Sequence, residues 1–540
     1  MIENDTTSAN RTSSDSQDRV FALLGAPSTY GCAEVRRIDT HAASVFLAGD
    51  KAYKVKRNVR FPFLDYSSLE KRHAACLSEL DVNRRFAPAL YRRVVPITRE
   101  PNGDLALDGK GEPVEWAVEM TRFDESRTLD HLAATNGLNA ALCRKLGRAV
   151  AAIHERAAPA DAKAWLAALR QYASGNTRAF RQHPGLFDQQ MVSDLDQRSH
   201  ATIIRLLPLL QDRAALGLVR RGHGDLHLGN LALVDEEPLA FDAIEFDPVI
   251  ASGDVLYDLA FLLMDLVERG LVDLSNVVLN EYFGAARRSA DLDGIAALPL
   301  FMSLRAAIRA NVTAARLLQV EHKDRPIIEA SARGYFDLAL KLLHPTRPAM
   351  ICTAGLSGTG KSVLAQALAP VVPPLPGALI LRSDVERKAM MGVSENQRLP
   401  PEAYGSDITT KLYDLLGEKA GRIARAGHSV IVDAVFARQS ERTAIEAGAR
   451  RADVLFCGLF LTAPLDVRLR RIGDRTGDAS DATAAVAREQ ESYELGKIGW
   501  MLLDASGSPA ETLKTACEAI TNSIKAPAPP LPAMRPNEGR

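Results

Sequence analysis

One glycine-rich octapeptide, residues 355–362, restricts the fold of this chain more than any other segment. It reads Gly-Leu-Ser-Gly-Thr-Gly-Lys-Ser and matches the pattern G-x-x-x-x-G-K-[ST]. An apolar run at residues 350–354 precedes it, and an apolar helical run at residues 363–368 follows it. In such a strand, loop and helix, backbone N–H groups and the positive end of the helix dipole surround phosphate oxygens. The segment therefore predicts a nucleotide-binding α/β domain in the C-terminal third.

The side chains of this loop have separate predicted roles. Glycine lets the backbone wrap closely around phosphate oxygens. Lys361 is expected to bridge the terminal phosphates of ATP, and Ser362 to bind Mg²⁺. The predicted nucleotide-binding residues are Gly355, Gly358, Thr359, Gly360, Lys361 and Ser362.

Two aspartates are predicted to lie beside the loop. The apolar run at residues 379–381 leads to Asp384, and the run at residues 430–432 leads to Asp433. Both are expected at the carboxyl ends of parallel strands, the edge of such a sheet that faces the ligand. Asp384 is a candidate base for an acceptor hydroxyl, with Arg387 holding the acceptor, and Asp433 is a candidate to hold Mg²⁺ through water. Helix capping is the alternative role for each aspartate.

A third group of polar residues follows at residues 463–481. Arg468, Arg471 and Arg475 recur at helical spacing before a glycine-containing polar turn. Arginines so placed can close over ATP as a lid and neutralise charge in the transition state, which makes Arg471 and Arg475 candidate ATP ligands. A solvated helix face is the alternative reading.

At these residues the chain resembles the AAA-type, zeta-toxin-like P-loop kinases. The resemblance rests on Asp384-x-x-Arg387, the Val-Ile-Val-Asp433-Ala segment and Arg475-Thr-Gly-Asp-Ala-Ser-Asp481, and it covers residues 349–523. Gluconate kinases and polynucleotide 5′-hydroxyl kinases are similar. The resemblance implies a base role for Asp384 and an acceptor-binding role for Arg387, but it identifies no acceptor.

A second motif lies in the N-terminal two thirds, at residues 223–230. It reads His-Gly-Asp-Leu-His-Leu-Gly-Asn, and Asp225 precedes Asn230 by five residues. This is the spacing of a kinase catalytic loop, in which the aspartate orients the acceptor hydroxyl and the asparagine binds Mg²⁺. Asp242 ends a short apolar run twelve residues farther on and is the candidate for the second metal contact.

Together these three residues resemble the aminoglycoside phosphotransferase family over residues 35–340. The resemblance implies a lysine on an early strand and a glutamate on the following helix. Lys54 fits the lysine, with Lys56 on the same strand face as the alternative; Glu79 fits the glutamate, with Glu70 as the alternative. Residues 40–45 depart from the pattern because they lack a G-x-G-x-x-G loop.

The rest of the chain indicates how these motifs are arranged. Two prolines between His344 and Pro348 predict a domain boundary there. A hairpin is expected at Gly49-Asp50, and helices are expected at residues 66–85, 139–156, 160–180 and 194–207. We expect four segments: a disordered tail (1–19), an α+β protein-kinase-like domain of the aminoglycoside phosphotransferase type (20–345), an α/β P-loop kinase domain with a parallel sheet (346–525), and a proline-rich disordered tail (526–540).

Composition excludes several other classes of function. Lysine plus arginine total 66 against 67 aspartate plus glutamate, so no general positive field favours nucleic acid. The six cysteines form no C-x-x-C pair, which is typical of reduced cytosolic thiols. We found neither a leader peptide nor an uninterrupted apolar span of membrane length. These features predict a cytoplasmic protein without a membrane partner.

The order of the two domains resembles the bacterial family of bifunctional aminoglycoside phosphotransferase-like, ATP-binding proteins. We therefore expect a kinase that uses ATP and Mg²⁺ in both halves to phosphorylate hydroxyl groups of small molecules. One alternative is a nucleotide-regulated switch in which one domain controls the other. Another is 5′-hydroxyl phosphorylation of nucleic acid by the C-terminal domain. The oligomeric state cannot be predicted from this sequence.

Overall fold

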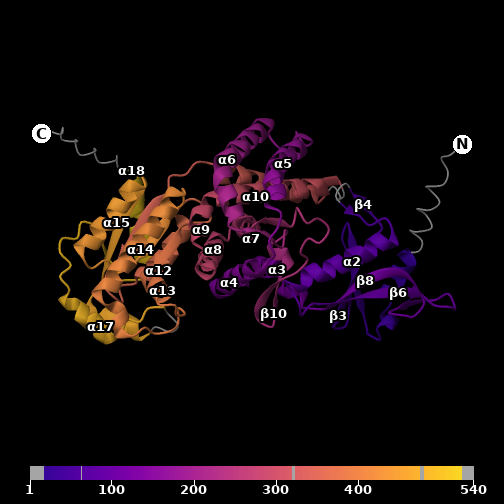
Figure 1. Ribbon diagram of the computed structural model, residues 1–540, viewed down its shortest axis with the longest axis horizontal. Helices are drawn as coiled ribbons and strands as arrows, with labels where there is room; N and C mark the ends of the chain where they lie inside the picture. The colour runs from indigo at the N-terminus through magenta and orange to yellow at the C-terminus, as the bar shows by residue number, and fades with distance from the viewer. Residues whose placement is uncertain (1–16, 62–63, 319–322, 475–478, 526–540) are drawn as a thin grey trace. The chain divides into compact units, whose positions relative to one another are not determined.

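The computed structural model describes residues 17–61, 64–318, 323–474 and 479–525 (Figure 1). Residues 17–25 are helical, so the last three residues of the predicted N-terminal tail belong to a helix. The reason is tertiary: the buried Gln17 side chain donates hydrogen bonds to Lys56 O and to Glu115 Oε2, both at 2.9 Å. The rest of that tail and the predicted tail at residues 526–540 lie outside the described residues.

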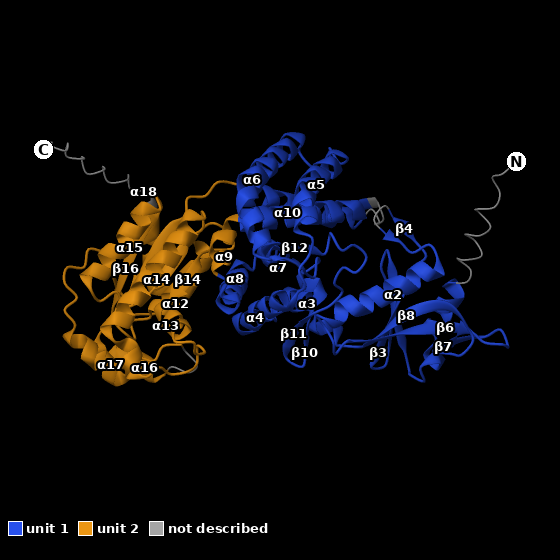
Figure 2. Cartoon of the chain, viewed as in Figure 1, with its two compact units in different colours: residues 1–288, 297–343 blue, residues 289–296, 344–540 orange. Residues whose placement is uncertain are grey.

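The chain forms two compact units (Figure 2). The first comprises residues 1–288 and 297–343, and the second comprises residues 289–296 and 344–540. The short helix α9 (Ser289–Gly294) thus belongs to the second unit, where Asp293 accepts hydrogen bonds from Arg422 of α14 (Ser406–Arg425).

The first unit begins with an antiparallel sheet in the order β1-β2-β3-β8-β6-β7. The hairpin expected at Gly49-Asp50 is confirmed, because β2 pairs with β3 across that turn. Sequence reasoning missed β6 and β8, whose side chains fill the core between this sheet and its neighbours. The elements of this lobe are β1 (Val35–Asp39), β2 (Ala43–Ala48), β3 (Lys51–Lys56), α2 (Leu69–Arg84), β6 (Tyr91–Arg99), β7 (Leu105–Leu107) and β8 (Glu112–Thr121), with the small pair β4 (Arg60–Phe61) and β5 (Leu64–Asp65).

Helices make up most of the remainder of this unit, with two small strand pairs between them. The four helices expected from periodicity are present as α2, α4, α5 and α6, and α6 is longer at both ends than expected. The bounds are α3 (Leu129–Ala134), α4 (Ala140–Arg156), α5 (Ala162–Arg181), α6 (Gln189–Ala215), β9 (Val219–Arg221), η3 (Leu228–Asn230), β10 (Leu231–Val234), β11 (Glu237–Ala240), β12 (Ser252–Asp254), α7 (Val255–Glu268), α8 (Val272–Ala286), α10 (Leu298–Ala315) and α11 (Arg325–Leu342). This is the expected α+β, kinase-like architecture.

One helical stretch, residues 289–315, is long and apolar enough to cross a membrane, with a mean hydropathy of 1.3. However, 67% of its most apolar window is buried inside the molecule. Core helices meet the same criteria of length and composition, and α10 packs between α7 and α11. Its burial identifies α10 as a core helix of the first unit.

The second unit contains the expected parallel sheet, in the order β14-β15-β13-β16-β17. Its central strands are buried on both faces because helices cover each side, which explains their continuous apolar sequence. The edge strand β17 was not expected, since it is short and largely exposed. The elements are β13 (Ala349–Ala354), α12 (Lys361–Leu368), β14 (Leu379–Arg382), α13 (Ser383–Met390), α14, β15 (Val430–Asp433), α15 (Gln439–Arg451), β16 (Leu455–Thr462), α16 (Leu465–Gly473), α17 (Ala484–Glu489), β17 (Met501–Asp504) and α18 (Pro509–Lys525).

A buried histidine just before β15 should make the second unit sensitive to acid. His428 is 1% exposed, and its Nε2 lies 2.9 Å from Gly377 O. Burial lowers the pKa of His428 to about 4, although the bond to Gly377 opposes that shift. Between this value and the ordinary histidine pKa, the folded state therefore binds fewer protons than the unfolded state, and its stability is lost as the pH falls.

We expect the wild-type chain to lose about 2 kcal/mol of unfolding free energy through His428 between pH 7 and pH 5. Urea unfolding at both pH values, followed by circular dichroism, measures it. In His428→Gln this part of the pH dependence should vanish, because glutamine can still donate to Gly377 O but does not titrate. An equal loss in wild type and variant would contradict the prediction.

Candidate active sites

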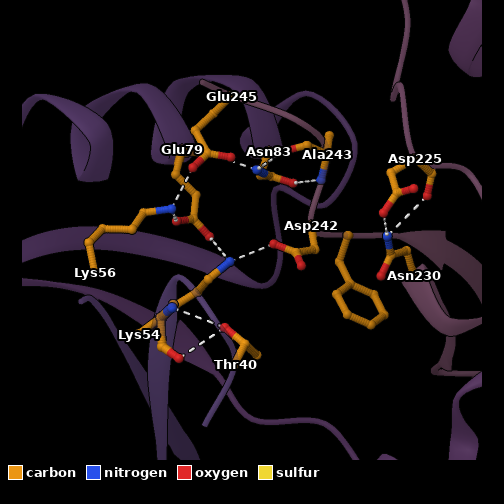
Figure 3. Close-up of polar contacts among 12 residues, drawn as sticks. Thr40, Lys54, Lys56, Glu79, Asn83, Asp225, Asn230, Asp242, Ala243 and Glu245 are labelled. Carbon is orange, nitrogen blue, oxygen red and sulfur yellow. Dashed lines mark hydrogen bonds and ion pairs between the residues drawn. The ribbon is translucent and has the colours of Figure 1, made fainter. Parts of the chain in front are cut away.

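The first unit joins lysines of β3 to a glutamate of α2 (Figure 3). Lys54 Nζ lies 2.7 Å from Glu79 Oε1 and 2.5 Å from Asp242 Oδ1. Lys56 Nζ lies 2.6 Å from Glu79 Oε2 and 2.5 Å from Glu245 Oε1. The ion pair expected between Lys54 and Glu79 is thus present, and Glu79 joins both candidate lysines. Which lysine contacts a nucleotide stays a prediction.

Electrostatics keep Lys54 and Glu79 charged although both side chains are largely buried. The Glu79 side chain is fully buried, and burial opposes its ionisation, but Lys54 and Lys56 hold its pKa below the ordinary value. Burial likewise opposes the charge on Lys54, yet Asp242 and Glu79 raise its pKa well above the usual range. A fixed ammonium group therefore lies beside Asp242, as the binding of a polyphosphate and its metal ion requires.

The catalytic-loop residues meet in the turn before β10. Asn230 Nδ2 donates to both Asp225 O and Asp225 Oδ2 at 3.0 Å. Burial opposes ionisation of Asp225, but His227 and more distant cations lower its pKa to about 2. Asp225 is therefore a carboxylate over the whole physiological range and is ready to accept a hydrogen bond from a hydroxyl group.

Buried charges of α7 and α10 hold this loop in place. Asp258 of α7 accepts hydrogen bonds from the backbone N–H groups of His223 at 2.8 Å and Gly224 at 3.0 Å. Arg305 of α10 donates to Gly224 O at 3.0 Å. Asp265 accepts from Leu228 N at 2.9 Å. A charged residue within an apolar helix was the available signal for Arg305 and Asp265.

A cavity of about 610 Å³ connects these groups. Lys54, Asp225 and Asp242 all line it, as does the turn between β1 and β2 at residues 40–42. That turn stands where the family pattern has a glycine-rich loop. The cavity is therefore lined by a cation, a candidate base and the candidate metal ligand Asp242.

In the second unit, the glycine-rich loop joins β13 to α12 as expected. Gly355 has φ +133°, and a Cβ there would lie 2.4 Å from Leu461 O. Gly358 has φ +86°, and a Cβ there would lie 2.7 Å from Arg468 O. Both positions require glycine, because a side chain would be strained and would collide with backbone. Arg468 also donates to Ser357 O at 2.8 Å, so this arginine supports the loop from α16.

Several other predicted residues of this unit lie close together beside the glycine-rich loop. Ser362 Oγ donates to Asp433 Oδ2 at 2.5 Å, and Arg382 Nε lies 3.5 Å from the same carboxylate. Lys361 Nζ donates to Leu356 O at 3.1 Å. Burial and the nearby Asp433 raise the pKa of Asp384, and Lys361 and Arg382 oppose that shift. Arg382 is a member of this cluster to which the sequence assigned no role.

Asp384 differs in position from the expectation. Strand β14 ends at Arg382, so Asp384 is the second residue of α13 rather than the end of a strand. The backbone turns into the helix two residues earlier than the apolar pattern suggested. The side chain remains at the edge where Lys361 and Asp433 lie, because α13 begins directly at the carboxyl end of its strand.

The predicted acceptor and lid arginines have protein partners. Arg387 is buried, donates to Ala403 O at 2.8 Å and lies over the Tyr404 ring at 4.8 Å. Arg471 donates to Gly507 O at 2.9 Å and lines a cavity of about 310 Å³ beside the glycine-rich loop. Their substrate contacts stay predictions, and Arg475 lies outside the described residues.

Both sites suit Mg²⁺. Among the described residues, no cluster of three histidine, cysteine or acidic side chains could hold a metal by itself. Mg²⁺ in nucleotide sites is bound by one or two hard oxygen ligands together with phosphates and water. Asn230 with Asp242 in the first unit, and Ser362 with Asp433 in the second, offer such ligands.

Comparison with known proteins gives two family matches. Residues 45–298 match the phosphotransferase enzyme family, and residues 350–494 match a family described as an AAA domain. Among curated proteins, uncharacterized protein Mb2027c of Mycobacterium bovis and uncharacterized proteins MT2060 and Rv2004c of Mycobacterium tuberculosis are each 30% identical to this chain over 474 residues. These matches cover 85% of this chain and 90% of each relative.

Several solved structures that are similar to this chain are kinases, at low sequence identity. A gluconokinase from Sinorhizobium meliloti is 20% identical with a TM-score of 0.25 and covers 34% of this chain and 99% of its own. A choline/ethanolamine kinase family protein from Mesorhizobium loti is 16% identical with a TM-score of 0.37, covering 61% and 95%. An aminoglycoside phosphotransferase from Alicyclobacillus acidocaldarius is 13% identical with a TM-score of 0.33, covering 57% and 90%.

Proposed function

Since this chain belongs to the same family as its mycobacterial relatives and is a kinase-type phosphotransferase, we propose that each unit transfers the γ-phosphoryl group of ATP to a hydroxyl group of a small molecule. Mg²⁺ is the metal in both units. The enzyme acts in the cytoplasm, and the two units make it bifunctional.

One observation supports the proposal for the first unit above all others. The Lys54–Glu79–Asp242 cluster and Asp225 with Asn230 line or adjoin a single cavity. Lys54 binds the phosphates, while Asn230 and Asp242 hold Mg²⁺, which neutralises charge on the transferred group. Asp225 accepts the proton of the acceptor hydroxyl while the oxygen of that hydroxyl forms a bond to the γ-phosphorus. The bond from that phosphorus to the bridging oxygen breaks, and ADP leaves.

The second unit performs the same reaction with different residues. The loop at residues 355–360 and Lys361 hold the triphosphate, and Ser362 with Asp433 holds Mg²⁺. Asp384 accepts the hydroxyl proton, and the pKa of this carboxyl, raised by burial and by Asp433, makes it a stronger base than an ordinary aspartate. Arg471 lies next to the loop, where it can contact the nucleotide.

A screen of metabolite pools for ATP-dependent phosphorylation tests the proposal. The full-length wild type is compared with Lys54→Met and Lys361→Ala. In Lys54→Met, Glu79 keeps Lys56 as an ion-pair partner, so the fold should persist. We expect wild type to label at least one product per unit, and each variant to lose the product of its own unit. Retention of ATP by a wild-type chain that labels no product would instead support a nucleotide-regulated switch.

A further inference from the structure

We call the part of the first unit's cavity that α10 lines its acceptor half, and this part contains an arginine as well as the candidate base Asp225. Beyond Asp225, the cavity continues toward α10, where Ile308, Arg309 and Val312 line it. Arg309 lies one helical turn after Arg305, which is buried and bound to Gly224 O. Thus Arg305 of α10 supports the catalytic loop, and Arg309 of the same helix lines the cavity. Helices α7 and α10 lie next to each other at this point (Figure 1).

Neighbouring residues hold Arg309 without cancelling its charge. Its guanidinium lies over the Tyr335 ring, 5.8 Å from the ring centre. Burial and the nearby Asp265 raise the pKa of Glu268 of α7, and Arg269 and Arg309 oppose that shift. In the described part of the chain, Arg309 forms no ion pair with a carboxylate. Its positive charge acts on Asp225, where it contributes to the lowered pKa, as well as on Glu268.

The carboxylates of this half of the cavity are already engaged. Apart from Asp225, the acids that line the cavity are Glu125, Asp242 and Glu245. Glu245 is bound to Lys56 at 2.5 Å and to the Tyr66 hydroxyl at 3.0 Å, Asp242 to Lys54 at 2.5 Å, and Glu125 to Arg36 at 3.1 Å. A cationic acceptor would therefore find no unpaired carboxylate among the described residues here besides the base itself. Its own charge would also be repelled by Arg309.

The remaining walls of this half are apolar. Phe261 lines the cavity together with Ile308, and Phe246 and Val312 are 38% and 51% exposed. Apolar side chains that stay exposed at the mouth of a polar site are typical of surfaces that bury part of a ligand.

From this arrangement we infer that the acceptor of the first unit is a hydroxy acid, whose carboxylate binds Arg309 and whose apolar portion lies against Phe246, Ile308 and Val312. A guanidinium group binds a planar carboxylate through two parallel hydrogen bonds, which fixes its orientation. The hydroxyl group then lies between this anchor and Asp225. The inference rests on the proposed kinase function of the first unit and names its substrate class.

Three kinds of probe test the inference on the full-length chain with ATP and Mg²⁺. The first are 3-hydroxybutyrate, 3-hydroxyhexanoate and 3-hydroxyoctanoate; the second are their methyl esters, which differ in charge but retain the hydroxyl; the third are choline and kanamycin, which are cations. Phosphorylation is measured as KM and kcat for each probe. Binding is measured separately, as the shift in Tm with Mg²⁺ and a non-hydrolysable ATP analogue.

We expect wild type to prefer at least one acid over its ester and over both cations. Arg309→Gln should raise KM for that acid about 10- to 100-fold and leave KM for the ester and for ATP within about threefold. Arg205→Gln, an exposed change on α6, is the matched control and should leave every value unchanged.

Other outcomes separate this inference from the proposed function. Phosphorylation of choline or kanamycin in preference to the acids would keep the kinase function and overturn the hydroxy-acid inference. An equal fall in kcat for acid and ester in Arg309→Gln would also overturn it, since Arg309 would then act on the phosphoryl group. An acid that stabilises wild type but not Arg309→Gln, without being phosphorylated, would support the inference and reject the transfer reaction. If no acid stabilises the chain or is phosphorylated, the inference is wrong.

Discussion

Replacing Asp225 with asparagine should lower kcat for the first unit about 10²- to 10⁴-fold, the range that a positioned general base contributes. Asparagine has the same shape, and its amide oxygen can still accept the hydrogen bond that Asn230 now donates to Asp225 at 3.0 Å. The fold and the lysine cluster should therefore be unaffected. The variant cannot take up the hydroxyl proton, because an amide is not basic at neutral pH.

Single-turnover phosphorylation of an acceptor identified by the screen measures this effect, and ATP affinity is measured alongside. Affinity should stay within about threefold, because Lys54 and the metal ligands are unchanged. Asp235→Asn is the matched control: Asp235 is exposed in a turn with φ +50°, a conformation that asparagine also adopts readily. A kcat within threefold of wild type for Asp225→Asn would rule out its role as the base.

Replacing Asp384 with asparagine should lower kcat for the second unit by a similar factor, about 10²- to 10⁴-fold. The carboxyl lies close enough to Asp433 for that charge to raise its pKa, so removing the negative charge relieves repulsion at the site. ATP affinity should therefore stay the same or increase, while turnover falls. A loss of both together would instead indicate damage to the glycine-rich loop.

Asp466→Asn is a close control for this variant. Asp466 is the second residue of α16, as Asp384 is of α13, so both substitutions remove an acid from the first turn of a helix. The Asp466 side chain is 76% exposed, and its partner Arg470 lies 3.8 Å away. Any general effect on a helix terminus should appear equally in both variants. A matching loss of kcat in Asp466→Asn would contradict a specific role for Asp384.

Local spacing predicted much of both candidate sites. Asp225 and Asn230 are five residues apart in one turn, so their hydrogen bond follows from the loop itself. Strand alternation placed Lys54 and Lys56 on one face, but it could not choose between them. The structure explains that ambiguity, since Glu79 has one carboxylate oxygen on each lysine.

The local sequence pattern did not predict contacts between residues that are far apart along the chain. Helical spacing suggested an acceptor-binding role for Arg387, which stays a prediction, but it could not show that Arg387 also donates to Ala403 O of the 3₁₀ helix Pro401–Tyr404. Arg382 was without a predicted role, although it lies 3.5 Å from Asp433 on the neighbouring strand. Strand β17 was missed because an exposed edge strand needs neither a long apolar run nor strict alternation.

The sequence by itself determined the two domain types and their candidate bases and metal ligands. Glycines, strand ends and turn spacings act over a few residues, where backbone sterics and side-chain period leave few alternatives. Only the tertiary structure decided that Arg305 supports the catalytic loop while Arg309, one turn away, lines the cavity. Both arginines have the same local sequence signal, and the packing of α7 and α11 around α10 determines which charge is buried and which faces a ligand.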